Sequence, residues 1–361
     1  MKIKLVLKFF GWVSVLGAGL SLSINTYAED LIAPKVVIIT MYEVGEYTGD
    51  APGEFQYWVE REGLDQVIPF SMGKHDLRMN ESGLLGVCTG GGVTNAAIVI
   101  TALGLDPRFN FSKSYFIVSG IAGGDPADIS IGGAAWSRWV VDGDLTRAID
   151  SREVPDDWPY GLFASDGSRP NEIGGKGYTW PNMAFTLNPG LVQWAYDLSK
   201  DVELSEHEEV ISYRALYDGL PNASGPPRVI LGESMGSNAY WHGQVLNQWA
   251  NDWVSLYTGG KGNFVMTNVE DNGTMRALTR LADSGRLDRD RILVLRTASN
   301  YSHQPPGESA IWSLTAPYPA DGLTAHESCY RVPAPVVHAL IDGWDIYEKT
   351  IPSKKPNWLA E

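Results

Sequence analysis

Carboxylate and amide side chains follow three predicted strands of this 361-residue chain, at the points where those strands end. Glu43 and Glu46 come after the first predicted strand, and Glu270, Ser299 and Asn300 come after two later ones. A single residue of this kind is often a helix cap, but several at separate strand ends favour a crevice that binds a ligand. In such a crevice a carboxylate can accept paired hydrogen bonds or act as a general base.

Three consecutive glycines, Gly90, Gly91 and Gly92, join an apolar strand directly to a helix. Glycines let the backbone approach a ligand with its N–H groups exposed, and the helix N-terminus behind them favours an oxygen-rich group. A second strand-to-glycine turn is predicted over residues 116–124. The spacing is not that of a dinucleotide-binding loop, which needs G-x-G-x-x-G and a later acidic residue. The pattern therefore predicts a site for a small molecule.

Strands and helices alternate along most of the chain, which predicts an α/β domain. The predicted strands cover residues 36–40, 83–88, 115–119, 134–141, 228–232, 264–267 and 292–297. Helices are predicted over residues 96–103, 190–198, 238–256 and 272–282, and again from near residue 334. Between about residues 145 and 227 the composition shifts to Trp, Pro, Gly and Asp, which predicts an irregular insertion.

The N-terminal segment, residues 1–28, has the pattern of a secretory signal peptide. It begins with lysines, continues with an apolar run over residues 9–22, and ends in small residues before a cleavage point after Ala28. We therefore expect an exported protein, periplasmic or secreted, with a mature domain over residues 29–361. The alternative is an uncleaved membrane anchor, for which the apolar run is short.

The net charge of −15 argues against nucleic acid or an anionic membrane as a partner, since either needs a basic surface. Cys88 and Cys329 are the two cysteines, and they either form a disulfide or stay as two thiols. The spacing of His, Cys and Asp residues matches no metal site, and no G-x-S-x-G motif indicates a serine hydrolase. We expect neither a metal nor a cofactor.

Six motifs occur in an order that resembles the nucleoside phosphorylases and nucleosidases. They are the acidic loop after the first strand, TGGGVTNAAIVITAL, SGIAGG with IGGAAWS, SNAYW, NVEDNGTM and LRTASN. Over nearly the whole mature chain the sequence is similar to the purine nucleoside permease family, which shares this architecture. The resemblance implies a three-layer αβα domain with a mixed central sheet, the nucleoside phosphorylase/hydrolase-like fold. It also implies a purine nucleoside as the ligand.

The same resemblance assigns residues to the ribose. It places Glu270 on the 2′ and 3′ hydroxyls, because one carboxylate can accept two hydrogen bonds. Thr94 and Asn95, which follow the glycines, are likewise expected at the ribose.

For the purine base, the resemblance implies that Tyr240 stacks on the ring and that Trp241 forms a further wall. Asn300, with Ser299 beside it, stands where nucleosidases carry an aspartic acid that protonates the base. An amide cannot act as an acid, but it can donate to N7 or to a 6-oxo group, so the change favours inosine or guanosine over adenosine.

Two histidines lie close to these motifs in the sequence. His242 follows the SNAYW motif and His303 follows Asn300. Each could donate to the ribose 5′ hydroxyl or to the base, or could instead face solvent.

The nucleophile is the least determined part of the site. A phosphorolytic enzyme needs a phosphate clamp, usually with arginine, whereas the loop after the first strand carries Glu43 and Glu46. Two carboxylates repel phosphate and favour water, with one of them as general base. We favour Glu46 as that base, with Glu43 holding it or the substrate. Phosphorolysis stays open if Arg78, Arg138 or Arg296 reaches the site, although Arg296 also fits a structural pair with a buried carboxylate.

Two classes of function remain open from the sequence. One is an exported purine nucleosidase that cleaves the N-glycosidic bond, and the other is a nucleoside-binding component that passes its ligand to a membrane transporter. A binding protein needs Glu270 and the stacking aromatic ring, but it has no use for a carboxylate beside the anomeric carbon. The insertion at about 145–227 could cover the pocket or join the subunits of a homo-oligomer.

Overall fold

The computed structural model describes residues 31–356 and 358, and the predicted signal peptide over residues 1–28 lies outside them. The strands are β1 (Val36–Thr40), β2 (Gln66–Ile68), β3 (Leu77–Met79), β4 (Leu84–Cys88), β5 (Tyr115–Gly124), β6 (Ala134–Trp136), β7 (Trp139–Asp142), β8 (Thr146–Ala148), β9 (Leu162–Ala164), β10 (Ala184–Thr186), β11 (Val229–Leu231), β12 (Glu233–Gly236), β13 (Phe264–Asn268) and β14 (Ile292–Tyr301). The helices are α1 (Gln56–Glu62), α2 (Val93–Leu105), α3 (Pro189–Ser199), α4 (Glu208–Arg214), α5 (Pro221–Ser224), α6 (Gln244–Tyr257), α7 (Asp271–Asp283), α8 (Ala310–Leu314), α9 (Leu323–Arg331), α10 (Ala334–Asp342) and α11 (Trp344–Tyr347), with short 3-10 turns η1 (Arg289–Arg291) and η2 (Pro319–Gly322).

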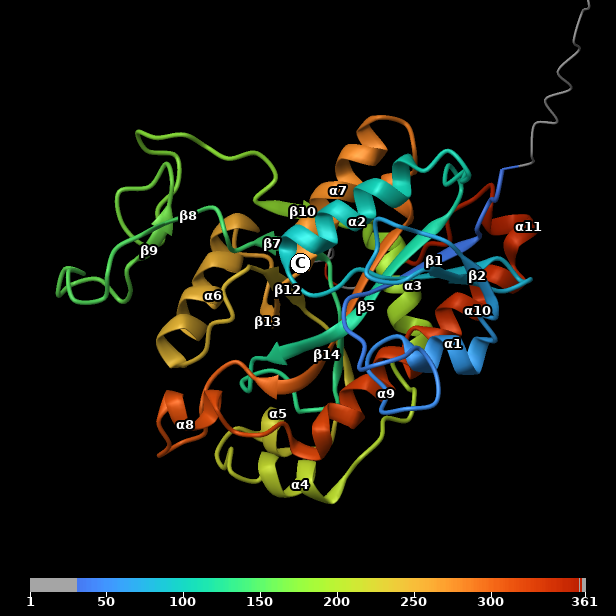
Figure 1. The fold of residues 1–361 in the computed structure, drawn as a ribbon. Coiled ribbons are helices and arrows are strands. Elements are labelled where there is room, and N and C mark those ends of the chain that lie inside the picture. The colour runs from blue at the N-terminus through green and yellow to red at the C-terminus, as the bar shows by residue number, and fades with distance from the viewer. Residues whose placement is uncertain (1–30, 357, 359–361) are drawn as a thin grey trace, which may run out of the picture. The chain divides into compact units, whose positions relative to one another are not determined.

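The central sheet has 12 strands and is mixed (Figure 1). β1 lies between β4 and β5 and is parallel to both, and β14 runs parallel to β5 over nearly its whole length. β13 then joins β5 in antiparallel orientation, and β12 and β7 continue that side of the sheet. β2 and β3 close the other edge as antiparallel strands. Because β1 and β4 are covered on both faces, their sequences are almost entirely apolar and fully buried.

Helices cover both faces of this sheet. α2 and α7 pack against each other on one face, while α9, α10 and α3 pack on the other side against β14, β1 and β6 (Figure 1). The predicted α/β class, a three-layer αβα arrangement with a mixed central sheet, is confirmed. Among the described residues, no helix has the length and apolar character needed to cross a bilayer.

The second predicted glycine turn, over residues 116–124, is wrong, because this segment is continuous strand in β5. The structure gives a different reason for one of its glycines. A Cβ on Gly120 would lie 2.8 Å from both the Arg296 guanidinium and the Glu54 carboxylate. Glycine at this position therefore lets two buried charged groups approach the strand.

Several predicted element boundaries also differ. The last strand, expected over residues 292–297, extends to Tyr301, so Ser299 and Asn300 lie within β14 and not after it. The strand expected over residues 134–141 is divided into β6 and β7, because the backbone N–H groups of Arg138 and Trp139 donate to the Glu233 carboxylate instead of continuing one ladder. The helix expected from residue 238 begins at Gln244, behind a cap at Gly243 whose φ of 114° suits glycine. The intervening residues, Asn238 to His242, form a loop.

The segment predicted as an insertion, about 145–227, is not uniform. β8 and β9 pair only with each other and lie apart from the central sheet (Figure 1). β10, by contrast, is hydrogen-bonded to β7 at the sheet edge, and α3 buries Leu191 and Val192 in the main core. The later part of this segment therefore belongs to the main layers.

Candidate functional site

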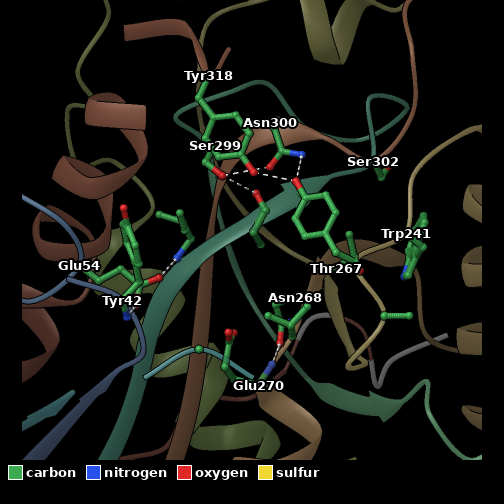
Figure 2. A pocket seen from close by; sticks show the side chains of 17 residues that line it. Tyr42, Glu54, Trp241, Thr267, Asn268, Glu270, Ser299, Asn300, Ser302 and Tyr318 are labelled. Atoms are coloured by element: carbon green, nitrogen blue, oxygen red, sulfur yellow. Dashed lines mark hydrogen bonds between the residues drawn. The ribbon is translucent and has the colours of Figure 1, made fainter. Parts of the chain in front are cut away.

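A cavity of about 250 Å³ lies where several strands of the central sheet end. Its walls come from the loop after β1, the glycine loop before α2, the second half of β5, the loop after β12, and the ends of β13 and β14 (Figure 2). The lining residues are Tyr42, Glu54, Gly91, Ile121, Ala122, Gly123, Ala239, Tyr240, Trp241, Thr267, Asn268, Val269, Glu270, Ser299, Asn300, Ser302 and Tyr318.

Glu54 is the carboxylate that reaches this cavity from the loop after β1 (Figure 2). It stands just before α1 and is 2% exposed. One of its oxygens accepts hydrogen bonds from the backbone N–H groups of Met41 (2.7 Å) and Tyr42 (3.0 Å), and the other accepts from Ile121 (2.7 Å). These bonds come from the residues that directly follow β1 and from β5, so they hold the carboxylate at the wall of the cavity.

Burial raises the pKa of Glu54 to about 7, because a carboxylate loses its hydration when it leaves water. The positive charge of Arg296 and the backbone hydrogen bonds lower this pKa, whereas the nearby Glu270 carboxylate raises it. Glu54 is therefore able to take up and release a proton near neutral pH.

Arg296, in the middle of β14, compensates the charge of the buried carboxylates around the cavity. Its guanidinium bonds the Asp271 carboxylate at 2.6 Å and the Glu270 carboxylate at 3.2 Å, and it also donates to the Ile121 carbonyl at 2.8 Å. Arg296 is 1% exposed. The sequence-based alternative for Arg296, a structural pair with a buried carboxylate, is confirmed.

Glu270 lines the cavity from the position that caps α7, as Figure 2 shows. One oxygen accepts the N–H of Gly92 at 3.2 Å, and the other faces Arg296. Burial raises the pKa of Glu270, and the Arg296 charge opposes that rise. Asn268 holds the turn before α7, because its side-chain oxygen accepts the N–H groups of Glu270 and Asp271.

The glycine loop contributes one wall of the cavity through Gly91. Gly90 and Gly92 adopt φ values of 79° and 99°, which favour glycine. Of the two polar residues that follow, Asn95 donates to the Gly91 carbonyl at 2.7 Å and so braces the loop. Thr94 is exposed and faces a different groove, so neither side chain lines the cavity.

The two carboxylates favoured from the sequence as the general base lie outside the cavity. Glu43 is buried and accepts four backbone N–H groups, including those of Gly53, Phe55 and Gln56, which shape the loop around it. The side chain of Glu46 is exposed to solvent. The structure thus assigns Glu43 to loop stability and leaves Glu54 as the loop carboxylate in the cavity.

Ser299, Asn300 and Tyr318 lie together at the end of the cavity opposite to Glu270 (Figure 2). The Asn300 amide donates to the Tyr240 hydroxyl (3.2 Å) and to the Tyr301 carbonyl (3.1 Å), and it accepts from Ser299 (3.1 Å). The Tyr240 and Tyr318 hydroxyls are 2.7 Å apart and hydrogen-bonded. Every predicted base-binding side chain therefore borders the cavity, and Tyr318 joins them from a distant part of the sequence.

The remaining predicted residues are divided between the cavity wall and its surroundings. Trp241 forms part of the wall while its ring packs against Trp249. His242 lines a small hollow next to the cavity, and burial lowers its pKa to about 4. The ring nitrogen Nδ1 of His303 is 2.8 Å from the Gln304 carbonyl, outside the cavity wall.

No arginine or lysine belongs to the described wall of the cavity. Arg138 forms an ion pair with Glu233, and Arg78 lies on β3 beside the ring of Tyr47. The described part of the chain also holds no cluster of His, Cys, Asp and Glu residues suited to a metal ion. Cys88 and Cys329 are buried free thiols.

Sequence reasoning missed Glu54, Asn268 and Tyr318. The sequence did contain a signal for Glu54, because this carboxylate follows Gly53 and comes just before the residues that begin a helix. Asn268 also had a signal, since it directly follows the predicted strand over residues 264–267, whereas Tyr318 had no comparable local signal.

Comparisons with known proteins identify the family to which the chain is related. A sequence model of the purine nucleoside permease (NUP) family matches residues 33–352. A purine nucleoside permease of Candida albicans is 31% identical over 335 residues, which are 91% of this chain and 80% of that protein. A probable purine nucleoside permease of Schizosaccharomyces pombe is 26% identical over 328 residues, or 88% and 92% of the two chains.

Solved structures also align with most of the chain, at low sequence identity. A 5′-methylthioadenosine/S-adenosylhomocysteine nucleosidase from Neisseria meningitidis aligns with a TM-score of 0.48 and 14% identity, covering 86% of this chain and all 100% of that one. A futalosine hydrolase from Helicobacter pylori aligns with a TM-score of 0.45 and 15% identity, covering 86% and 97%.

Proposed function

This chain belongs to the purine nucleoside permease family, and we propose that it binds a purine nucleoside in the cavity and hydrolyses its N-glycosidic bond with Glu54 as general base. The ribose lies at the end with Glu270, and the base lies at the end with Asn300. The predicted preference for 6-oxopurines forms part of the proposal.

The observation that carries the proposal is the position of Glu54. A group that only helps to bind a neutral ligand has no need of a buried carboxylate whose pKa is about 7. A general base needs a pKa close to the operating pH and access to the water molecule that it activates. Glu54 lines the cavity, so water held there can attack the anomeric carbon while the carboxylate takes its proton.

The choice of water over phosphate is supported by the charges of the wall. Glu54 and Glu270 are its two acidic residues, and no cation belongs to it among the described residues. Arg296 is nearby, but Asp271, Glu270 and the Ile121 carbonyl occupy its donors. A phosphate dianion in this cavity would meet carboxylates without a clamp.

A nucleoside-binding component of an uptake system is the second candidate. The names of the relatives favour it, since both are called permeases. Such a component uses Glu270 and the aromatic wall in the same way, and it could pass its ligand to a membrane transporter. It differs in one measurable respect, because it returns the nucleoside intact.

The deciding experiment is incubation of the purified chain with inosine, guanosine and adenosine, with and without phosphate. We expect free base and ribose from inosine and guanosine, no ribose 1-phosphate, and slower release from adenosine. Adenosine presents an amino donor where the other two present an oxygen acceptor, and the phenolic O–H groups of Tyr240 and Tyr318 suit the acceptor. Intact nucleoside after long incubation would leave the binding component standing.

Glu270→Gln should weaken nucleoside binding without affecting free purine. The loss of charged hydrogen bonds to the ribose hydroxyls costs about 1.5–3 kcal/mol, whereas a free base does not contact this end of the cavity. Calorimetry with a nucleoside and with its free base separates the two. Equal weakening of both ligands contradicts the ribose assignment.

Export is a further part of the proposal and rests on the sequence pattern of residues 1–28. We expect the exported protein to begin at or near Glu29, which N-terminal sequencing of the periplasmic or secreted fraction measures. A mature protein that retains the lysines at the start of the chain rules out cleavage after Ala28.

A further inference from the structure

The departing base develops negative charge when its bond to the sugar breaks, and a donor must neutralise that charge. Asn300 has no acidic proton. Both amide protons are also committed in this structure, one to the Tyr240 hydroxyl and one to the Tyr301 carbonyl. Because a carbonyl oxygen can only accept, the NH₂ group of Asn300 must face Tyr301, which fixes the orientation of the amide.

The Tyr240 and Tyr318 hydroxyls are the remaining acidic donors at this end of the cavity. Together they carry two protons and share one hydrogen bond of 2.7 Å, which uses one of them. The Tyr240 oxygen also accepts from Asn300. One phenolic proton of the pair is therefore uncommitted among the described contacts.

We propose that the Tyr240–Tyr318 hydroxyl pair donates this proton to the departing purine, in place of a carboxylic acid; the inference rests on the proposed hydrolysis. The C1′–N9 bond breaks and its electron pair stays on the base, whose N7 takes the phenolic proton. The water oxygen bonds to C1′ and gives its proton to Glu54. Solvent then returns a proton to the phenolate and accepts the proton from Glu54, so atoms and charge balance. Tyr240 and Tyr318 are thus catalytic residues, and Asn300 is a positioning residue.

The backbone that follows Tyr318 holds its hydroxyl in a defined position. Ala320 and Asp321 have φ values of 52° and 50°, a left-handed conformation that is costly for residues other than glycine. The N–H of Ala320 donates to Glu209 on α4 at 2.8 Å, which holds the strained turn. Burial raises the pKa of Tyr318, which makes its phenol a weaker acid, so Tyr318 suits the role of donor to the Tyr240 oxygen within the pair.

The test compares inosine with 7-methylinosine in the wild-type chain and in Tyr240→Phe and Tyr318→Phe. In 7-methylinosine the base already carries a positive charge at N7, so it departs without a proton from the protein. We expect each substitution to lower kcat for inosine by about 10²-fold, the scale of a lost general acid, and to leave kcat for 7-methylinosine nearly unchanged.

Cleavage of 7-methylinosine also reports that each variant is folded and retains its nucleophile. Tyr178→Phe is the matched control, since Tyr178 is 62% exposed and lies outside the cavity wall. Equal slowing of both substrates by Tyr240→Phe and Tyr318→Phe overturns the tyrosine proposal while the proposed function stands. If the wild-type chain cleaves neither substrate, the proposed function fails and this inference fails with it.

Discussion

Glu54→Gln should lower the rate of base release by about 10²-fold or more, while the nucleoside still binds. Glutamine keeps the shape of the side chain, so packing in this buried position is preserved. It cannot accept the proton of the attacking water, so the loss appears in kcat. Single-turnover release of base, together with calorimetric binding of the nucleoside, measures the two effects separately.

The pH profile gives a second readout of the same residue. The active form is the carboxylate, and burial raises its pKa to about 7. The wild-type rate should therefore increase as the pH rises through about 7 and become constant above it, because Glu54 is then ionised. The residual rate of Glu54→Gln should lack this increase.

Glu46→Gln is the matched control, because Glu46 belongs to the same loop but its side chain is exposed to solvent. We expect its rate and pH profile to equal those of the wild type. A large loss in Glu46→Gln combined with a small one in Glu54→Gln would restore the sequence-based choice of base and contradict the geometry described above.

Arg296→Met should lower the free energy of unfolding by about 3–5 kcal/mol, the usual cost of leaving a buried charge without its partner. Asp271 is fully buried and Arg296 is its ion-pair partner at 2.6 Å. Methionine fills much of the same volume, so the loss reflects the uncompensated carboxylate more than a cavity. Urea unfolding at constant pH measures this change in the free energy of unfolding.

The control for this change is Arg152→Met, which breaks an ion pair with Asp150 at the surface. Solvent screens such exposed pairs, so we expect no measurable shift in its unfolding midpoint. A wild-type midpoint in Arg296→Met would contradict the view that this guanidinium stabilises the buried carboxylates. Any activity that remains in Arg296→Met should need a higher pH, because the Arg296 charge lowers the pKa of Glu54.

The two expected results have a common origin in the carboxylates around the cavity. Glu54, Glu270 and Asp271 are buried together beside one guanidinium. Such an arrangement is costly for folding, yet it keeps the Glu54 pKa close to neutral. Stability and the proposed chemistry are therefore coupled through Arg296.

The sequence by itself determined the central strands, several helices and some of the residues at the strand ends. The apolar runs of β1, β13 and β14 are readable because strands covered on both faces need continuous apolar side chains. Glu270 and Asn300 come at or just after the ends of such strands, so their location at the cavity follows from chain order. The position of the glycine loop before α2 was also predictable, because the loop directly follows the apolar strand β4.

Only the tertiary structure decided which loop carboxylate enters the cavity. It also decided which side chains meet at the end of the cavity near Asn300. Glu43, Glu46 and Glu54 belong to one irregular segment, and no periodicity distinguishes their directions. The choice depends on the backbone N–H groups of Met41, just after β1, and of Ile121 in β5, which donate hydrogen bonds to the Glu54 carboxylate. Likewise, Tyr318 reaches Tyr240 through a contact between residues distant in the sequence. Local patterns set the strands and helices because these depend on near neighbours, whereas the acid–base groups depend on contacts that exist only after the chain has folded.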